Sequence, residues 1–286
     1  MGAAGSVFIM DVARSSQMGK PSELTDFLAF TSAWVRGVAG QTSDSISLTH
    51  RFGDEVLLVA SGFEGAYVLA FYIMATWPFP EHLPYFGVGY GDLRTEFPRD
   101  EDLEVWNSPV VKQARTAADV LKHEKPANRQ WLLFSTDDLS TGGLLNEYAL
   151  IQDRFFRMQT PADHLAAAIY TIRDVQAWVA EKLAKSRSTI SRQVRKSNAD
   201  VIIATKNRVV SVLHELGRAS AAGGGEESGG EESGWVAGGG IDSEGADSAD
   251  ALHPRVLENH IQHELTRRTQ ELIRYAHRGA GSTGIE

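Results

Sequence analysis

The chain contains no cysteine, which excludes a disulfide-stapled fold and a thiolate metal site. It also lacks a long apolar run, because the longest, residues 65–77, is too short to span a bilayer. Its first residues carry no basic segment ahead of an apolar stretch, as a secretory signal would. These absences predict a cytoplasmic protein with no membrane partner.

Basic residues are outnumbered, with 28 Lys and Arg against 37 Asp and Glu and a formal net charge of −9. Their distribution is uneven. Residues 173–218 hold 10 basic and 4 acidic residues, whereas residues 219–250 hold 8 acidic residues and no basic ones. An acidic chain with one basic segment predicts a polyanion partner for that segment only.

Apolar periodicity divides the first part of the chain into alternating strands and helices. Strands are predicted over 6–12, 45–61 (as a hairpin), 83–96 and 129–138, and helices over 22–39, 64–77 and 108–124. This order predicts an α+β fold, a sandwich with helices on one face of the sheet.

The strand patterns then stop. Helical spacing predicts helices over 143–158, 160–172, 175–183, 186–197, 199–217 and 254–279. The Gly/Ser/Glu-rich stretch before the last of these cannot bury a core and predicts a flexible linker. We therefore divide the chain into an α+β domain (1–140), a helical domain (141–218), an acidic linker (219–250) and a C-terminal amphipathic helix and tail (251–286).

Two aspartates lie where predicted strands end. Asp11 closes the first strand, and Asp54 lies in the hairpin turn. If the two strands are neighbours, both carboxylates emerge at the same end of the sheet. Mg²⁺ and Mn²⁺ are hard ions that take oxygen ligands, such as two carboxylates and a triphosphate. Ordinary turn or capping chemistry also explains each aspartate taken alone.

Four stretches, "VFIMDVARSS", "HRFGDEVLLV", "GVGYGDL" and "EVWNSPVVKQAR", resemble the class III nucleotidyl cyclase catalytic domain in order and spacing, over roughly residues 6–135. The resemblance implies a ferredoxin-like, palm-type sandwich in which Asp11 and Asp54 bind Mg²⁺ or Mn²⁺. It implies that Arg115 is the catalytic arginine that neutralises charge on the phosphates of a nucleoside triphosphate. It also implies that His50 and Glu104 contact the base.

The sequence departs from that family at important positions. Val111 stands where the family has the Asn that orients the ribose, and the His50/Glu104 pair is typical of neither adenylyl nor guanylyl cyclases. When its C-terminal half is included, the chain is similar to the SatD family, whose members look like a reduced cyclase domain fused to a nucleic-acid-binding module.

The basic segment has the spacing of a helix-turn-helix. Ala180 is the small residue of the first helix, Ser186 is the expected cap of the second, and Ile190 and Val194 are expected to face the core. The residues expected to contact double-stranded DNA are Arg187, Ser188, Thr189, Ser191, Arg192 and Arg195, with Lys196, Lys206 and Arg208 on the DNA backbone. The alternative is a solvated basic helix in an ordinary bundle.

Both halves predict a homodimer, because helix-turn-helix proteins usually bind as dimers and class III cyclase sites form between two subunits. The favoured hypothesis is a nucleotide-responsive DNA-binding transcription regulator with a cyclase-like sensory domain. One alternative is an active metal-dependent nucleotidyl cyclase. The other is a DNA-binding dimer whose cyclase-like core is purely structural.

Overall fold

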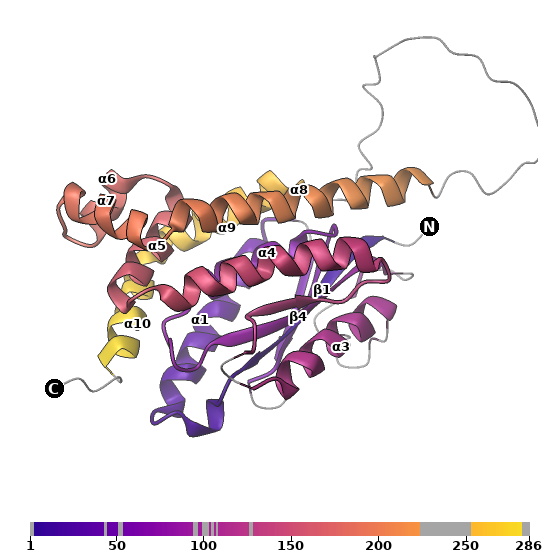
Figure 1. Cartoon of the computed structure of the whole chain (residues 1–286), viewed down its shortest axis with the longest axis horizontal. Helices are drawn as coiled ribbons and strands as arrows, with labels where there is room; N and C mark the ends of the chain where they lie inside the picture. Colours follow the sequence, from indigo (N-terminus) through magenta and orange to yellow (C-terminus); the bar gives the residue numbers. More distant parts are fainter. Residues whose placement is uncertain are drawn as a thin grey trace, which may run out of the picture.

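The protein has a mixed α+β structure, shown in Figure 1 as a computed structural model. It describes residues 3–42, 45–50, 54–93, 97–98, 103, 106, 108–125, 128–223 and 253–281. In that part of the chain, no helix is both long and apolar enough to cross a membrane.

The sheet module, residues 3–134, contains the strands and the helices between them. Its elements are β1 (Ala4–Val12), a 3₁₀ turn (Ser15–Gln17), α1 (Pro21–Ala39), β2 (Ile46–His50), β3 (Val56–Ser61), α2 (Gly65–Ala75), β4 (Pro84–Asp92), α3 (Pro109–His123) and β5 (Leu132–Phe134). The sequence therefore predicted the order of elements correctly.

The sheet has the strand order β2-β3-β1-β4-β5, with β1 in the centre. The pairs β2–β3, β1–β3 and β1–β4 are antiparallel, and β4–β5 is parallel. The end of β1 lies beside the start of β4, where Asp11 is opposite Tyr85. This register decides which residues surround Asp11.

Helices cover both faces of the sheet, so the prediction of helices on one face is wrong. Phe8 and Met10 pack in the main core with α1 and α2, whereas Val7 and Ile9 pack in a second core under α3. Both faces of β1 are therefore apolar. A strand that is buried on both sides reads as a continuous apolar run, and the run Val7–Met10 is therefore the signal of a second layer that the one-face prediction did not use.

Glycines in β4 let α3 lie directly on the sheet. A Cβ at Gly87 would come within 2.2 Å of the Ala114 carbonyl oxygen and the Ala118 nitrogen, and one at Gly89 within 2.6 Å of the Val110 carbonyl oxygen. The pattern "GVGYG" is thus a packing surface for α3.

The helical module, residues 139–223, begins with a helix that covers the edge of the sheet. Asn146 accepts a hydrogen bond from the Phe134 nitrogen (2.7 Å) and donates one to its carbonyl oxygen (3.1 Å). These bonds occupy the outer backbone groups of Phe134 in β5, which would otherwise be open to another strand. Its helices are α4 (Leu139–Met158), α5 (Pro161–Arg173), α6 (Gln176–Lys182), α7 (Arg187–Lys196) and α8 (Ala199–Gly223).

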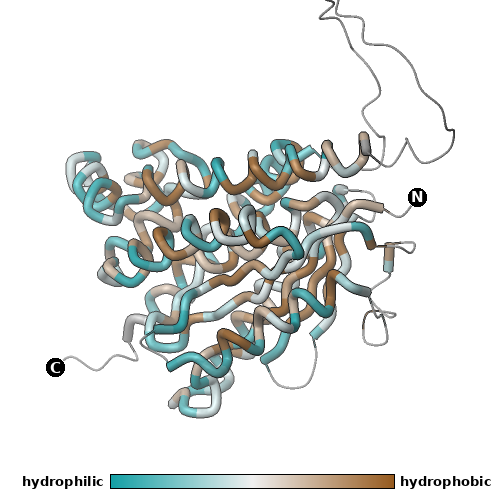
Figure 2. Tube along the Cα trace, turned by 45° about the vertical axis from the view of Figure 1, so that its right-hand side comes forward, coloured by the Kyte–Doolittle hydropathy of each residue, from teal (hydrophilic) through white to brown (hydrophobic). Residues whose placement is uncertain are grey.

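The C-terminal segment is docked on the rest of the chain. The predicted single helix is two, α9 (Pro254–Arg267) and α10 (Thr269–Gly281), separated at Arg268. Glu258 of α9 pairs with Lys206 of α8, whose side chain is only 5% exposed. Lys206 is therefore not available to DNA, contrary to the expectation from sequence. Figure 2 shows the hydropathy of the whole fold, in which apolar residues follow the strands and the inner sides of the helices.

Candidate functional site

The carboxylates of Asp11 and Asp54 meet at the end of β1. The Val12 backbone N–H donates to both, at 2.8 Å to Asp11 Oδ1 and 3.3 Å to Asp54 Oδ2. The two side chains lie within hydrogen-bonding reach of each other, and the Ser15 hydroxyl also reaches Asp54. The predicted convergence of these two residues is confirmed. It follows from the β1–β3 pairing, in which Met10 lies opposite Val56.

The two carboxyl groups have different environments. Burial opposes ionisation of Asp11, but hydrogen bonds from Tyr85 (2.6 Å) and Lys122 (3.2 Å) outweigh it and lower the pKa of Asp11. Burial, assisted by the negative charge of Asp11, raises the pKa of Asp54. A crowded pair of this kind is what a divalent cation relieves, because it neutralises the charge that the two carboxylates share.

Basic side chains gather beside the pair. A cavity of about 270 Å³ next to Tyr85 is lined by Arg14, Arg129 and Arg157. The Arg129 guanidinium stacks 4.8 Å from the centre of the Tyr85 ring. Gln130, which also lines the cavity, has a buried side-chain oxygen with no hydrogen-bond partner. The cavity thus adjoins Tyr85, the hydrogen-bond partner of Asp11, and its wall carries Arg14 and Arg129 together with the acidic Glu81. Its excess of positive charge favours an anionic ligand.

The sequence did not identify the residues that surround the carboxylates. Lys122, Tyr85 and Arg129 were not among the predicted site residues, although Tyr85 lies directly opposite Asp11. Only the strand register reveals that neighbour. A positive φ of 58° at Arg14, three residues after Asp11, is a further mark of a constrained loop.

The other predicted nucleotide-site residues do not join this pair within one chain. Arg115 is exposed on α3, seven residues before Lys122, or about 10 Å along the helix. His50 contacts Ser32 of α1 at 2.5 Å, and burial and the charge of Arg36 lower its pKa. It thus faces α1, whereas Asp11 faces α3. Glu104 lies outside the described residues.

Val111, at the expected ribose-orienting position, is a core residue. It is 5% exposed and packs with Val7 and Ile9 between α3 and the sheet. Its side chain therefore has a packing role in this chain. Among the described residues, no group of three or more His, Cys, Asp or Glu side chains could hold a metal. The fit to a metal ion depends on the Asp11–Asp54 pair together with oxygens of a ligand.

The basic helix α7 has the surface that the sequence predicted. Ser186 accepts a hydrogen bond from the Thr189 nitrogen at 3.1 Å and caps the helix, while Ile190 and Val194 are 0% and 1% exposed. Arg187, Ser188, Ser191, Arg192, Arg195 and Lys196 are exposed, and Thr189 is half-buried. Lys196 differs from the arginines because it forms an ion pair with Asp163 of α5 at 3.0 Å.

The helices around α7 fix its orientation. Four residues, 183–186, join α6 to α7, and Ala180 is buried at 7% exposure. The C-terminal cap of α7, Ser197, accepts a hydrogen bond from Gln159 at 2.9 Å. In Figure 1, α6 and α7 lie together at one end of α8, away from α3.

Comparison with known proteins gave no match to a family model, to a curated protein or to a solved structure.

Proposed function

We propose that this protein is a nucleotide-responsive, DNA-binding transcription regulator. On this proposal the sheet module is a ferredoxin-like, palm-type domain related to class III cyclases and SatD proteins, and α6 and α7 form a helix-turn-helix. The β-α-β-β-α-β order with antiparallel neighbours β2-β3-β1-β4 supports the first assignment. The short turn between α6 and the basic α7 supports the second.

The observation that carries the nucleotide proposal is the convergence of Asp11 and Asp54 beside a cavity that arginines line. With a nucleoside triphosphate, the two carboxylates would share Mg²⁺ or Mn²⁺ with phosphate oxygens. The ion supplies charge neutralisation there. Arg14 and Arg129 would bind the remaining anionic groups of the ligand. Lys122 would keep Asp11 ionised through its ion pair with that carboxylate.

The packing of Val111 favours ligand binding over turnover. A cyclase must orient the ribose for attack, and the expected position carries a buried apolar side chain. An active cyclase remains the second candidate, because the exposed Arg115 could act on a site of a second subunit. A purely structural core is the third, and it leaves the half-buried, mutually repelling carboxylates unexplained.

The nucleotide proposal is tested by mixing the purified full-length protein with each nucleoside triphosphate and Mn²⁺. We expect metal-dependent binding without pyrophosphate release, and loss of binding in Asp11→Ala and Asp54→Ala. Asp119→Asn is the matched control, because Asp119 is exposed on α3. Turnover that Asp54→Ala abolishes would instead establish the cyclase, and absence of any nucleotide binding would leave the scaffold.

The DNA proposal is tested with the promoter region of the protein's own gene. Affinity should fall steeply with salt, because cationic side chains displace counterions from phosphates. Arg192→Ala should weaken specific binding about tenfold or more. Normal binding by that variant would show that α7 does not face the DNA.

A further inference from the structure

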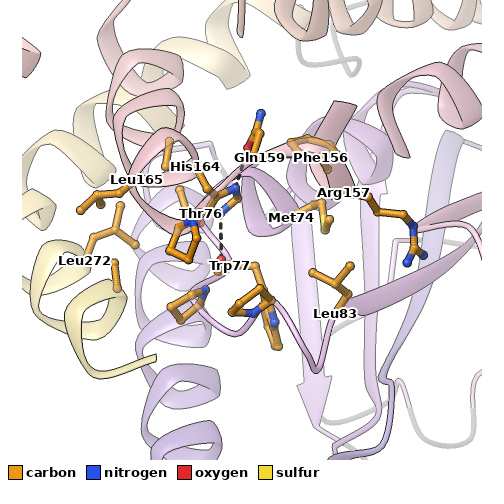
Figure 3. Close-up of a pocket in the computed structure, with 15 residues that line it drawn as sticks. Met74, Thr76, Trp77, Leu83, Phe156, Arg157, Gln159, His164, Leu165 and Leu272 are labelled. Carbon is orange, nitrogen blue, oxygen red and sulfur yellow. Dashed lines mark hydrogen bonds between the residues drawn. The ribbon is translucent and has the colours of Figure 1, made fainter. Parts of the chain in front are cut away.

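A cavity lies where the sheet module, the helical module and the C-terminal segment meet. Its volume is about 250 Å³, and its wall includes Met74, Trp77, Leu83, Phe156, Leu165 and Leu272 (Figure 3). These residues come from α2, the α2–β4 loop, α4, α5 and α10. The wall is predominantly apolar, as small-molecule sites usually are.

The polar groups in the wall already have protein partners. His164 contacts the Trp77 carbonyl oxygen at 2.9 Å through Nε2 and the Gln159 Oε1 at 2.8 Å through Nδ1 (Figure 3). The Thr76 hydroxyl donates to the Tyr72 carbonyl oxygen at 2.7 Å. Arg157, which also lines the wall, forms an ion pair with Asp153 at 2.7 Å. Since these groups are engaged, the wall offers little to a charged or strongly polar ligand.

The cavity also touches both regions that the proposed function requires. On one side, the Leu83 carbonyl oxygen accepts a hydrogen bond from the Ala13 nitrogen at 3.1 Å, in the loop that follows Asp11. On the other side, Gln159 joins His164 to Ser197, the C-terminal cap of α7. A ligand in the cavity would therefore contact Leu83, which is hydrogen-bonded to the loop after Asp11, and the His164–Gln159 pair, which is hydrogen-bonded to the end of α7.

We propose that this cavity binds an uncharged, mostly apolar small molecule with a volume of roughly eight water molecules. The ligand holds α10 against the α2–β4 loop and α5. Binding itself does not rest on the nucleotide or DNA proposals, because it is measured as stabilisation of the folded chain. Transmission of the signal to α7 does rest on the DNA proposal.

The experiment uses benzene and indole as probes on the full-length protein. The midpoint of thermal unfolding should rise with probe concentration and approach the logarithmic dependence of a single site. Ala276→Phe, which narrows the cavity from α10, should remove this dependence, whereas Ala222→Phe on the exposed end of α8 should retain it. Ala168→Met narrows the cavity from α5 and covers the case in which Ala276→Phe does not fold.

Two outcomes would overturn the proposal. One is a midpoint that does not respond to either probe up to its solubility limit. The other is an equal response in the wild type and in the folded cavity-filling variants.

A separate observation concerns the outer side of α4. Leu144, Tyr148, Ile151, Phe155 and Met158 follow one another at alternating intervals of four and three residues, the spacing of a helix-pairing seam. Leu144, Ile151 and Met158 are 48%, 40% and 73% exposed. Val201 of α8 is 42% exposed and extends this apolar surface past Tyr148.

The charges beside this seam are self-complementary. Glu147 and Arg154 are both exposed, and each precedes a seam residue, Tyr148 and Phe155 respectively. If two copies of α4 pair antiparallel about a two-fold axis near residue 150, Glu147 lies opposite Arg154 of the partner subunit. The same symmetry repeats the pair on the other side of the axis.

We infer that the α4–α8 surface binds a second copy of this chain through antiparallel pairing of α4. This inference gives an interface to the homodimer that the sequence predicts. The oligomeric state does not depend on ligand or DNA binding, so the two proposals can fail separately.

Sedimentation equilibrium of charge-reversal variants tests the pairing. The wild type should be a dimer, Glu147→Arg and Arg154→Glu should each weaken it about tenfold or more, and the double variant should recover most of the loss. Ile151→Glu should give a monomer, whereas Val120→Glu, at a residue that is 49% exposed on α3, should remain a dimer. A monomeric wild type, a dimeric Ile151→Glu, or a double variant no better than the singles would overturn the inference.

Discussion

The carboxylate pair and the surface of α7 represent two kinds of candidate site. The pair joins Asp11 and Asp54, which are far apart in the chain, and its side chains are half-buried with pKa values shifted in opposite directions. The α7 surface lies within ten residues, and its arginines are exposed. A distant pair depends on strand register, whereas a local surface depends only on one capped helix.

Gly87→Val should have the largest effect, and it changes the sheet side of this comparison, because Gly87 lies under α3. The added side chain would collide with the α3 backbone at Ala114 and Ala118, so α3 and its Lys122 must move. We expect a loss of about 3 kcal/mol or more in the free energy of unfolding. Denaturant unfolding measures it. Gly143→Ala, where a Cβ meets nothing, should stabilise α4 slightly, and equal losses in both variants would contradict the packing argument.

Arg192→Ala and Lys196→Ala should distinguish a side chain of α7 that is free to contact DNA from one that is held in an ion pair within the protein. Arg192 is exposed, whereas Lys196 is held by Asp163. We expect Arg192→Ala to weaken DNA binding about tenfold or more, and Lys196→Ala to have a smaller effect because its ion pair already competes with phosphate. Titration of a labelled operator at several salt concentrations makes the comparison. Equal losses would mean that Asp163 releases Lys196 to the DNA.

Asn substitutions should shift stability in opposite directions at the two carboxylates. The raised pKa of Asp54 means that its ionised form destabilises the fold as pH rises above the usual value of 3.8. Asp54→Asn should therefore be more stable at pH 7, by about 1 kcal/mol or less after solvent screening. The pKa of Asp11 is lowered, so the ionised carboxylate stabilises the fold at every pH above the ordinary pKa of 3.8. This stabilisation is lost as the pH falls below 3.8 through the lowered pKa. Asp11→Asn should be less stable.

Urea unfolding of both Asn variants from pH 3 to pH 8 checks these signs. Mn²⁺ added together with a nucleoside triphosphate should raise the unfolding midpoint of the wild type and leave both variants unchanged. Destabilisation by Asp54→Asn at neutral pH would show that its hydrogen bonds outweigh the repulsion from Asp11.

The smallest expected effect is at His164, between the two regions. Burial lowers the pKa of His164 below its ordinary value of 6.5, opposed by its hydrogen bond to Trp77. Its stabilising contribution is complete above 6.5 and is lost as the pH falls from about 7 through about 6 toward the lowered pKa, because the unfolded chain then binds a proton that the folded chain does not. Comparison with His164→Gln over this interval isolates the contribution. A pH dependence unchanged by the substitution would exclude His164 as its source.

The sequence alone determined the local structure of this protein. Strand and helix order, the hairpin that carries Asp54, and the Ser186 cap of α7 follow from periodicity and capping, which act over a few residues. Its prediction of one helix over 254–279 was wrong at Arg268, since the amphipathic pattern continues through the break. The prediction of helices on one face was wrong because the continuous apolar run of β1 requires cover on both faces, although it does not identify α3 as the second cover.

Only the tertiary structure decided which side chains meet. Strand register placed Tyr85 against Asp11, glycine packing brought Lys122 of α3 to the same carboxylate, and docking of α10 closed the apolar cavity beside His164. These contacts join residues that are distant in sequence, and their positions follow from how the layers pack. The physical reason is that local preferences act through the backbone of neighbouring residues, whereas burial and electrostatics act through space.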